Sequence, residues 1–250
     1  MTDTLTPPSG IGPAAPPQRA MPLAARIAGV IFSPGDTYQS VAVHPRVLGV
    51  LVVATLVMAA ATFVFLSTEV GQNAVLDQQM QVMESFRINL PDEVYDRMED
   101  QAGLQRYWAA GGLLVMSPLI CALVTGLMLL VFNVALGGDA TFKQAYAIVA
   151  HSQVLLALQQ LFILPLNYAR ETMSSATTLG VFLPMLDETS FFARLLGWID
   201  LFRIWWLVSL AIGAAVLYKR KSGPIAWTLL GLYLVFALVV AAALTAFAGA

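Results

Sequence analysis

Imidazole and amide side chains are scarce in the apolar parts of this sequence, and most of them gather in one segment. His151, Gln153, Gln159 and Gln160 lie within a single run of apolar residues. Such groups could line a path for an ion or solute, or they could hydrogen-bond neighbouring helices. On a helix, Gln153 and Gln160 lie about 20° apart and His151 lies nearly opposite. Polar groups on several sides favour a central helix that bonds its neighbours, and a polar cavity is the alternative.

Three more polar residues are candidates for the same intramembrane polar site or for a structural role. Asn133 lies near the end of another apolar run, where we expect a hydrogen bond between helices. Asp200 and Arg203 are three residues apart, and this spacing places both on one face of a helix. We expect them to form a structural ion pair or an interface anchor.

Motifs for catalysis or metal binding are absent from the sequence. It contains no H-E-x-x-H, no Walker A and no G-x-S-x-G pattern. Its one cysteine, Cys121, lies in an apolar run and reads as a small buried hydrophobe. We therefore expect no enzyme activity, no cofactor and no metal site.

Composition indicates an integral membrane protein. Hydrophobic residues make up 58% of the 250 residues and charged residues 11%, against roughly 45–50% and 25% in soluble domains. So few charges cover a soluble surface poorly, whereas a surface that faces lipid needs no such cover. The net charge of −2 gives no basic field for nucleic acid, so the expected partner is the lipid bilayer, with membrane-protein partners or a homo-oligomer possible.

The apolar runs predict an all-α integral membrane protein with five transmembrane helices. A helix needs about 20 apolar residues to cross the hydrocarbon layer. The five-helix domain covers 47–250, and its spans are expected at about 47–66, 109–136, 145–167, 201–218 and 225–248.

Two segments precede the first span. Residues 1–22 are rich in proline and predict a disordered tail. Residues 23–46 contain apolar positions at helical spacing in two stretches too short to span, separated at Ser33 and Pro34. We expect two amphipathic helices in the membrane interface there.

The first long loop, 67–108, predicts a helical hairpin outside the bilayer. Apolar residues recur at about 3.6-residue spacing, and Asn89-Leu90-Pro91 then breaks the pattern. Pro91, followed by acids, starts a second helix that could continue into the next span. The apolar positions of the first helix are Leu76, Met80, Met83, Phe86 and Leu90.

Orientation follows from the basic residues of the short loops. Lys143 and the cluster Lys219, Arg220 and Lys221 lie in the two short connections, while the long loops are acidic or mixed. We therefore expect a multi-pass protein of the cytoplasmic (inner) membrane, with a cytoplasmic N-terminus and an outer C-terminus.

Short motifs in the same order resemble the Yip1 family, prokaryotic branch. Ile31-Phe32-Ser33-Pro34 and then His44-Pro45-Arg46 resemble its first segment before the spans. Gly137-Gly138-Asp139-Ala140-Thr141-Phe142-Lys143-Gln144 resembles its loop between spans two and three, and Asp200-Leu201-Phe202-Arg203-Ile204-Trp205 the start of its span four.

The resemblance implies a non-enzymatic membrane protein. Eukaryotic members are linked to vesicle trafficking and prenylated small GTPases, but their Asp-Leu-Tyr-Gly-Pro motif is absent here, so that role is not carried over. We expect a membrane organiser or adaptor that acts through protein or lipid contacts. The alternative is a small channel or transporter that uses the polar face of the third span.

The predicted topology is testable with single cysteines in a Cys121→Ala background. A cysteine replacing Ser222 should react with an impermeant maleimide only from the cytoplasmic side, and one replacing Asn89 only from outside, because short basic loops stay inside. Labelling of both positions from the same side would contradict the five-span arrangement.

Overall fold

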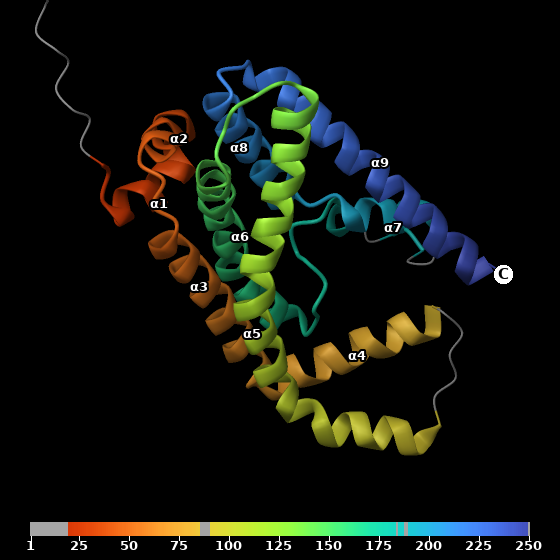
Figure 1. The fold of residues 1–250 in the computed structure, drawn as a ribbon. Coiled ribbons are helices and arrows are strands. Elements are labelled where there is room, and N and C mark those ends of the chain that lie inside the picture. The colour runs from red at the N-terminus through yellow and green to blue at the C-terminus, as the bar shows by residue number, and fades with distance from the viewer. Residues whose placement is uncertain (1–19, 86–90, 184, 188–189, 250) are drawn as a thin grey trace, which may run out of the picture.

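The computed structural model describes residues 20–85, 91–183, 185–187 and 190–249. Every element of regular secondary structure in these residues, apart from one isolated β-bridge, is a helix. Figure 1 shows them as a bundle with a hairpin extending from one end. In chain order they are α1 (Leu23–Phe32), α2 (Pro34–Val43), α3 (Leu48–Leu66), α4 (Glu69–Ser85), α5 (Asp92–Leu129), the π-helix η1 (Leu130–Ala135), α6 (Phe142–Arg170), the 3₁₀-helix η2 (Leu179–Phe182), α7 (Phe191–Trp198), α8 (Leu201–Leu217) and α9 (Ser222–Gly249).

Among the described residues, four helices are long and apolar enough to cross a bilayer. They are α3, the segment Gln101–Ala135 of α5 and η1, α6, and the segment Ser222–Ala246 of α9. The prediction of an all-α membrane protein is thereby confirmed. Helix α8 is apolar but has 17 residues, which is short of a full span, so the fifth crossing stays a prediction.

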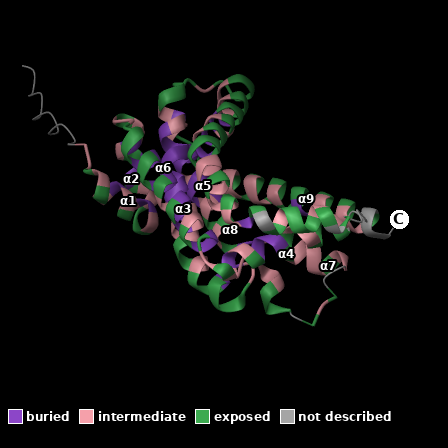
Figure 2. Ribbon diagram, turned by 90° about the horizontal axis from the view of Figure 1, so that it is seen from below, coloured by how far each residue is buried: buried purple, intermediate pink, exposed green. Residues whose placement is uncertain are grey.

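The centre of the bundle is α6, which packs against α1, α2, α3, α5 and α8. Of the 18 residues that form the most apolar stretch of α6, 61% are buried, whereas 11% are buried in the corresponding stretch of α9. Ile148 and Leu155 of α6 are fully buried in the main apolar cluster. Figure 2 shows the buried residues gathered around α6 and few along α9. The polar third span is therefore the innermost helix of the bundle.

The start of α6 is fixed by the capping box that the sequence predicts. The backbone N–H of Gln144 donates to Thr141 Oγ1 (3.3 Å), and the backbone N–H of Thr141 donates to Gln144 Oε1 (3.0 Å). These bonds satisfy donors that a helix start leaves without an intrahelical partner. Gln144 Nε2 also donates to the Ala42 carbonyl (3.2 Å), which ties this helix start to α2.

The two short N-terminal helices pack their apolar faces onto the bundle. Val30 of α1 and Tyr38 and Val41 of α2 are fully buried. The Tyr38 hydroxyl lies 2.8 Å from Ser209 Oγ of α8, and a Cβ at Gly213 would come within 3.4 Å of the Tyr38 ring. An amphipathic pattern does not reveal whether lipid or protein covers its apolar side, and here protein does.

The hairpin of the first long loop begins with a tight turn after α3. Thr68 Oγ1 accepts from the backbone N–H of Gly71 (3.0 Å), and a Cβ at Gly71 would lie 2.0 Å from the Phe65 carbonyl oxygen, so only glycine fits. Ala74 and Val75 of α4 then pack with Phe65 and with partly buried residues of α5, α6 and the loop that follows it. The base of α4 is thus anchored to the bundle.

The second arm of the hairpin is the start of α5. This helix begins after Pro91 and runs without interruption into the spanning segment, over 38 residues. Gln79 Nε2 donates to Gln105 Oε1 across the two arms (3.0 Å). The predicted helix break at Asn89-Leu90, and the apolar positions Phe86 and Leu90, lie outside the described residues.

The anchoring of α4 predicts that a charge introduced on its buried face loosens the hairpin, whereas a charge introduced on its exposed face does not. Val75→Asp should open the base of the hairpin, because it replaces a buried side chain worth about 1.5–3 kcal/mol with an unpaired carboxylate. Limited proteolysis from the hairpin side of reconstituted protein should show cleavage within α4 at least ten times faster than in the wild type. Gln78→Asp, at an exposed position of the same helix, is the control; equal cleavage of both variants would contradict the anchored base.

Candidate intramembrane polar site

His151 of α6 is paired with an arginine from the N-terminal helices. Arg26 Nη1 lies 3.1 Å from His151 Nε2 and donates to the Arg46 carbonyl (2.9 Å), while His151 Nδ1 lies 2.7 Å from the Ala147 carbonyl oxygen. A carbonyl only accepts and a guanidinium only donates hydrogen bonds. The imidazole therefore carries its hydrogen on Nδ1 and accepts at Nε2, a neutral form that suits both neighbours.

Arg26 is a site residue that sequence reasoning missed. Its side chain is 6% exposed, its Nε is buried without a hydrogen-bond partner, and the two bonds of Nη1 are the only ones its guanidinium makes within the described residues. Burial, and then the positive charge of Arg46, lower the pKa of Arg26. The one available signal was a lone cation among the apolar residues of α1.

Gln153 joins α6 to the second span. Its Oε1 accepts from Ser117 Oγ (3.2 Å), and its Nε2 donates to Cys121 Sγ (2.9 Å). Ser117 Oγ also lies 3.2 Å from Thr55 Oγ1 of α3. Three helices thus meet at one small chain of polar groups. Cys121 is fully buried and serves as an acceptor there.

Gln159 reaches the loop between α6 and α8. Its Nε2 donates to Asp200 Oδ2 (2.9 Å), which also accepts from the hydroxyls of Ser175 and Thr177, both at 2.7 Å. Asp200 is 2% exposed. A buried carboxylate is stable only with such hydrogen bonds, so this cluster holds the loop against the bundle.

The second oxygen of Asp200 caps α8. Asp200 Oδ1 accepts from the backbone N–H groups of Phe202 (2.8 Å) and Arg203 (3.2 Å), and its negative charge lies at the positive end of the helix. The structure thus joins Asp200 to Arg203 through the backbone N–H of Arg203, whereas the sequence predicted a contact with its guanidinium. The side-chain ion pair stays a prediction.

The remaining candidates point to other neighbours. Gln160 Nε2 lies 3.4 Å from Thr62 Oγ1 of α3, and Ser152 Oγ accepts from Trp206 Nε1 of α8 (2.9 Å). Asn133 Nδ2 donates to the Ala140 carbonyl (2.8 Å) and so closes the loop between η1 and α6. Asn133 lies apart from the polar groups of α6.

The predicted site residues are thus distributed around α6, each bonded to a different neighbour. None of His151, Gln153, Gln159, Gln160 or Asn133 lines the large pocket of the described chain, which lies between α5, α8 and α9. Within the described residues no group of three or more His, Cys, Asp or Glu side chains is placed to hold a metal ion. Hydroxyls such as Thr55 and Ser117 gave no signal in the sequence, because a hydroxyl in a helix commonly bonds its own backbone.

An all-helical bundle with several membrane-length apolar helices defines a multi-pass membrane protein. The family model of the Yip1 domain matches residues 28–244, and the chain belongs to the Yip1 family. This confirms the resemblance seen in the motifs, in a family of generally non-enzymatic membrane proteins. Among curated proteins and solved structures no match is found.

The pairing of Arg26 with His151 predicts a non-additive effect on stability. Arg26→Met should lower the free energy of unfolding by about 1–3 kcal/mol, because it leaves buried acceptors without a donor. The double variant Arg26→Met with His151→Leu should recover part of that loss, since both polar partners are then gone. Thermal unfolding of the purified protein in detergent measures both.

Arg46→Met is the matched control for this experiment. Arg46 is exposed and offers Arg26 its backbone carbonyl, which the substitution preserves. Its stability should stay close to that of the wild type. An Arg26→Met protein as stable as Arg46→Met would show that the buried pair is not structural.

Proposed function

We propose that this chain is a non-enzymatic membrane organiser or adaptor of Yip1 type in the cytoplasmic membrane. It acts through contacts with other membrane proteins or with lipid. Its N-terminus and the turn Lys219–Lys221 face the cytoplasm, and the hairpin of α4 and α5 faces outward, in line with the basic short loops. Residues 23–46 and the five-helix domain 47–250 act as one folded body. The tail predicted at 1–22 lies, up to residue 19, outside the described residues.

The observation that supports this proposal is the way α6 uses its polar groups. His151, Ser152, Gln153, Gln159 and Gln160 each bond to a side chain of another element. A transport path needs polar groups that remain available to a solute. Here these polar groups hydrogen-bond to other parts of the protein and hold them together, which favours a scaffold over a channel or transporter.

A second observation concerns the outer helices. In the most apolar window of α5 only 22% of residues are buried, and in α9 only 11%. Exposed apolar side chains along α5 include Val115 and Leu119, which are 62% and 55% exposed. Such surfaces meet lipid tails or the helices of other membrane proteins. The two spanning helices with the smallest buried share are those open to partners.

The proposal predicts that polar substitutions in α6 affect stability without affecting transport. Gln153→Leu should cost about 0.6 kcal/mol, the average for a hydrogen bond inside a membrane. Gln160→Leu should cost less, because its bond is longer and its side chain is partly exposed. Proteoliposomes of the wild type and both variants should show the same flux of protons, sodium ions and small metabolites as empty liposomes.

Proximity labelling in cells completes this test. A biotin ligase fused to the N-terminus should label a reproducible set of membrane proteins. If partners bind the outer face of α5, the double variant Leu119→Ala, Leu123→Ala should label fewer of them. A flux above that of empty liposomes, abolished by Gln153→Leu while stability is retained, would establish the channel or transporter instead.

A further inference from the structure

A large apolar pocket lies where the second span meets the last two helices. Its volume is about 850 Å³, and its walls come from the end of α5, η1, α8 and the first half of α9. Ligand pockets in proteins usually hold about 300–1,000 Å³. Helix α5 packs on α3 and α6, while α9 packs on α8 and α7, and the pocket fills the space that this divergence leaves.

The walls of the pocket are hydrocarbon and open to the side. Leu127 and Val131 from one wall are 55% and 49% exposed, and Leu232 from the other is 62% exposed. Leu207, Leu210 and Ala214 of α8 are buried behind them and form the back. An opening flanked by exposed leucines in a spanning helix faces the lipid tails, so an apolar chain can enter from within the bilayer.

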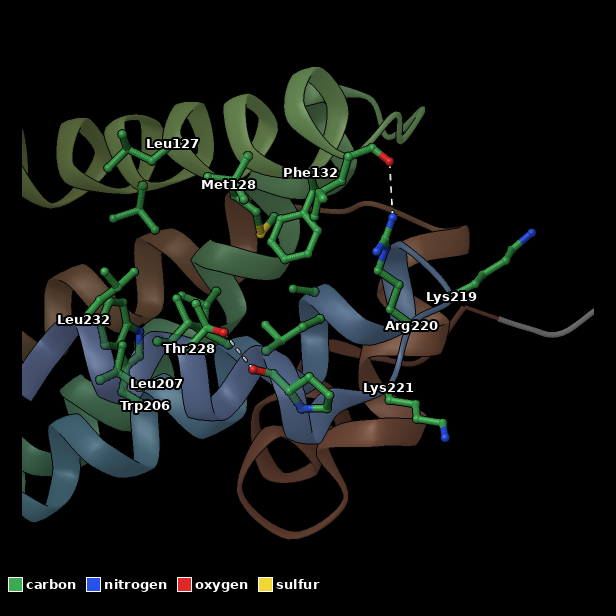
Figure 3. A pocket seen from close by; sticks show the side chains of 18 residues that line it. Leu127, Met128, Phe132, Trp206, Leu207, Lys219, Arg220, Lys221, Thr228 and Leu232 are labelled. Atoms are coloured by element: carbon green, nitrogen blue, oxygen red, sulfur yellow. Dashed lines mark hydrogen bonds between the residues drawn. The ribbon is translucent and has the colours of Figure 1, made fainter.

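One end of the pocket is cationic. Lys219, Arg220 and Lys221 belong to its lining and are exposed at the turn between α8 and α9. Figure 3 shows these three side chains at one end of the pocket and Leu127 and Leu232 at the other. The lining therefore changes from basic to apolar along its length. This arrangement is complementary to an amphiphile that has an anionic head and an apolar tail.

The length of the pocket fits one leaflet of a bilayer. Leu232 follows Lys221 by eleven residues of α9, a distance of about 16 Å along a helix. Half of the hydrocarbon core is about 15 Å thick. A lipid whose phosphate lies at the basic turn would thus place its chains beside the apolar walls as far as the middle of the bilayer.

The cationic end is built from two loops that hold each other in place. Arg220 Nη2 donates to the Leu136 carbonyl (3.2 Å), and the rings of Phe132 and Tyr218 stack at 4.6 Å. A Cβ at Gly138 would lie 2.7 Å from the Tyr218 ring, so glycine is needed for this approach. Lys219 itself has a φ of 51°, which turns the chain sharply after α8.

A local irregularity adds to the pocket wall. Residues Leu130–Ala135 form a π-helix, and two of them, Val131 and Phe132, line the pocket. Short π-helical segments within α-helices are often found at functional sites, because they change the direction of side chains at some cost in stability. Here the segment lies at the point where the apolar wall meets the basic end.

Charge distribution favours a lipid over a second copy of this chain. The acids of α4 and of the start of α5 lie at the other end of the molecule (Figure 1), so a parallel copy would not bring them to the basic turn. The segments at the same end, 34–47, 137–143 and 219–221, contain the acids Asp36 and Asp139, against five exposed basic side chains, Arg46, Lys143, Lys219, Arg220 and Lys221. Anionic headgroups are the abundant negative charges at such a surface.

We propose that this pocket binds an anionic phospholipid, with its acyl chains between α5 and α9 and its phosphate against Lys219, Arg220 and Lys221. The site exists whether or not the protein acts as an adaptor, so the two proposals are tested separately. Binding here would give the protein a preference for membranes or membrane regions rich in acidic lipid.

Native mass spectrometry of the purified full-length chain tests the site. The protein is mixed with equimolar phosphatidylglycerol and phosphatidylcholine that carry identical oleoyl chains. We expect retained phosphatidylglycerol to exceed phosphatidylcholine clearly in the wild type. The triple variant Lys219→Gln, Arg220→Gln, Lys221→Gln should lower this ratio roughly tenfold or more, since each basic side chain favours anionic lipid. Its control is Arg97→Gln, Arg170→Gln, Arg203→Gln, which removes the same charge from exposed positions outside the pocket.

A second variant tests the apolar part and covers the case of a triple variant that does not fold. Thr228 lines the pocket at an exposed position of α9, so Thr228→Trp should fill the pocket and reduce retention of both lipids while the basic turn is intact. Lipid ratios that are equal for the wild type, the charge variant and its control would overturn the proposal.

Photo-crosslinking identifies the occupant in membranes. With p-benzoylphenylalanine in place of Leu229, illumination should add the mass of one phospholipid, and Thr228→Trp should suppress that adduct. A crosslinked dimer in place of the lipid adduct would overturn the proposal and show the pocket to be an interface between copies. Failure of the flux or proximity experiments would leave these results unchanged.

Discussion

A buried polar group in a bilayer must find its partner within the protein, and α6 contains more such groups than any other spanning helix of the described chain. The imidazole of His151 and the amides of Gln153 and Gln159 bond to α1, α5 and Asp200 respectively. Apolar side chains alone give helices in a bilayer little preference for one neighbour over another, because the lipid tails are as apolar as leucine. The polar contacts therefore determine which helices surround α6 and how each of them is rotated about its own axis.

The same constraint accounts for the N-terminal helices. α1 and α2 are too short to cross the membrane, and yet Arg26 and Tyr38 insert polar groups into the bundle and find His151 and Ser209 there. Burial raises the pKa of Tyr38, so its hydroxyl remains neutral as a hydrogen-bonding group. The N-terminal helices thus complete the hydrogen bonding of α6 and α8, and the match to the Yip1 domain, which starts at residue 28, includes most of them.

Much of the fold could be predicted because its signals are local. Apolar runs, the capping box at Thr141 and the proline at position 34 each act within a few residues, and the structure has helices at these places. The pairing of Arg26 with His151 spans 125 residues, and no pattern in one sequence encodes such a distance. The role of Asp200 was only half visible, since its spacing from Arg203 suited an ion pair, whereas its partners in Ser175 and Thr177 come from an irregular loop.

The continuity of α5 has a consequence for the two sides of the membrane. A helix of 38 residues is about 57 Å long, nearly twice the roughly 30 Å of hydrocarbon it crosses, so its N-terminal part extends beyond the hydrocarbon layer as one arm of the hairpin. Two places depart from regular α-helical hydrogen bonding: Pro118, which deprives the helix of one backbone hydrogen bond, and the π-helical turn at Leu130–Ala135. The segment between them forms one wall of the apolar pocket. The hairpin on one side of the membrane and the pocket wall near the other are thus parts of one continuous run of helix.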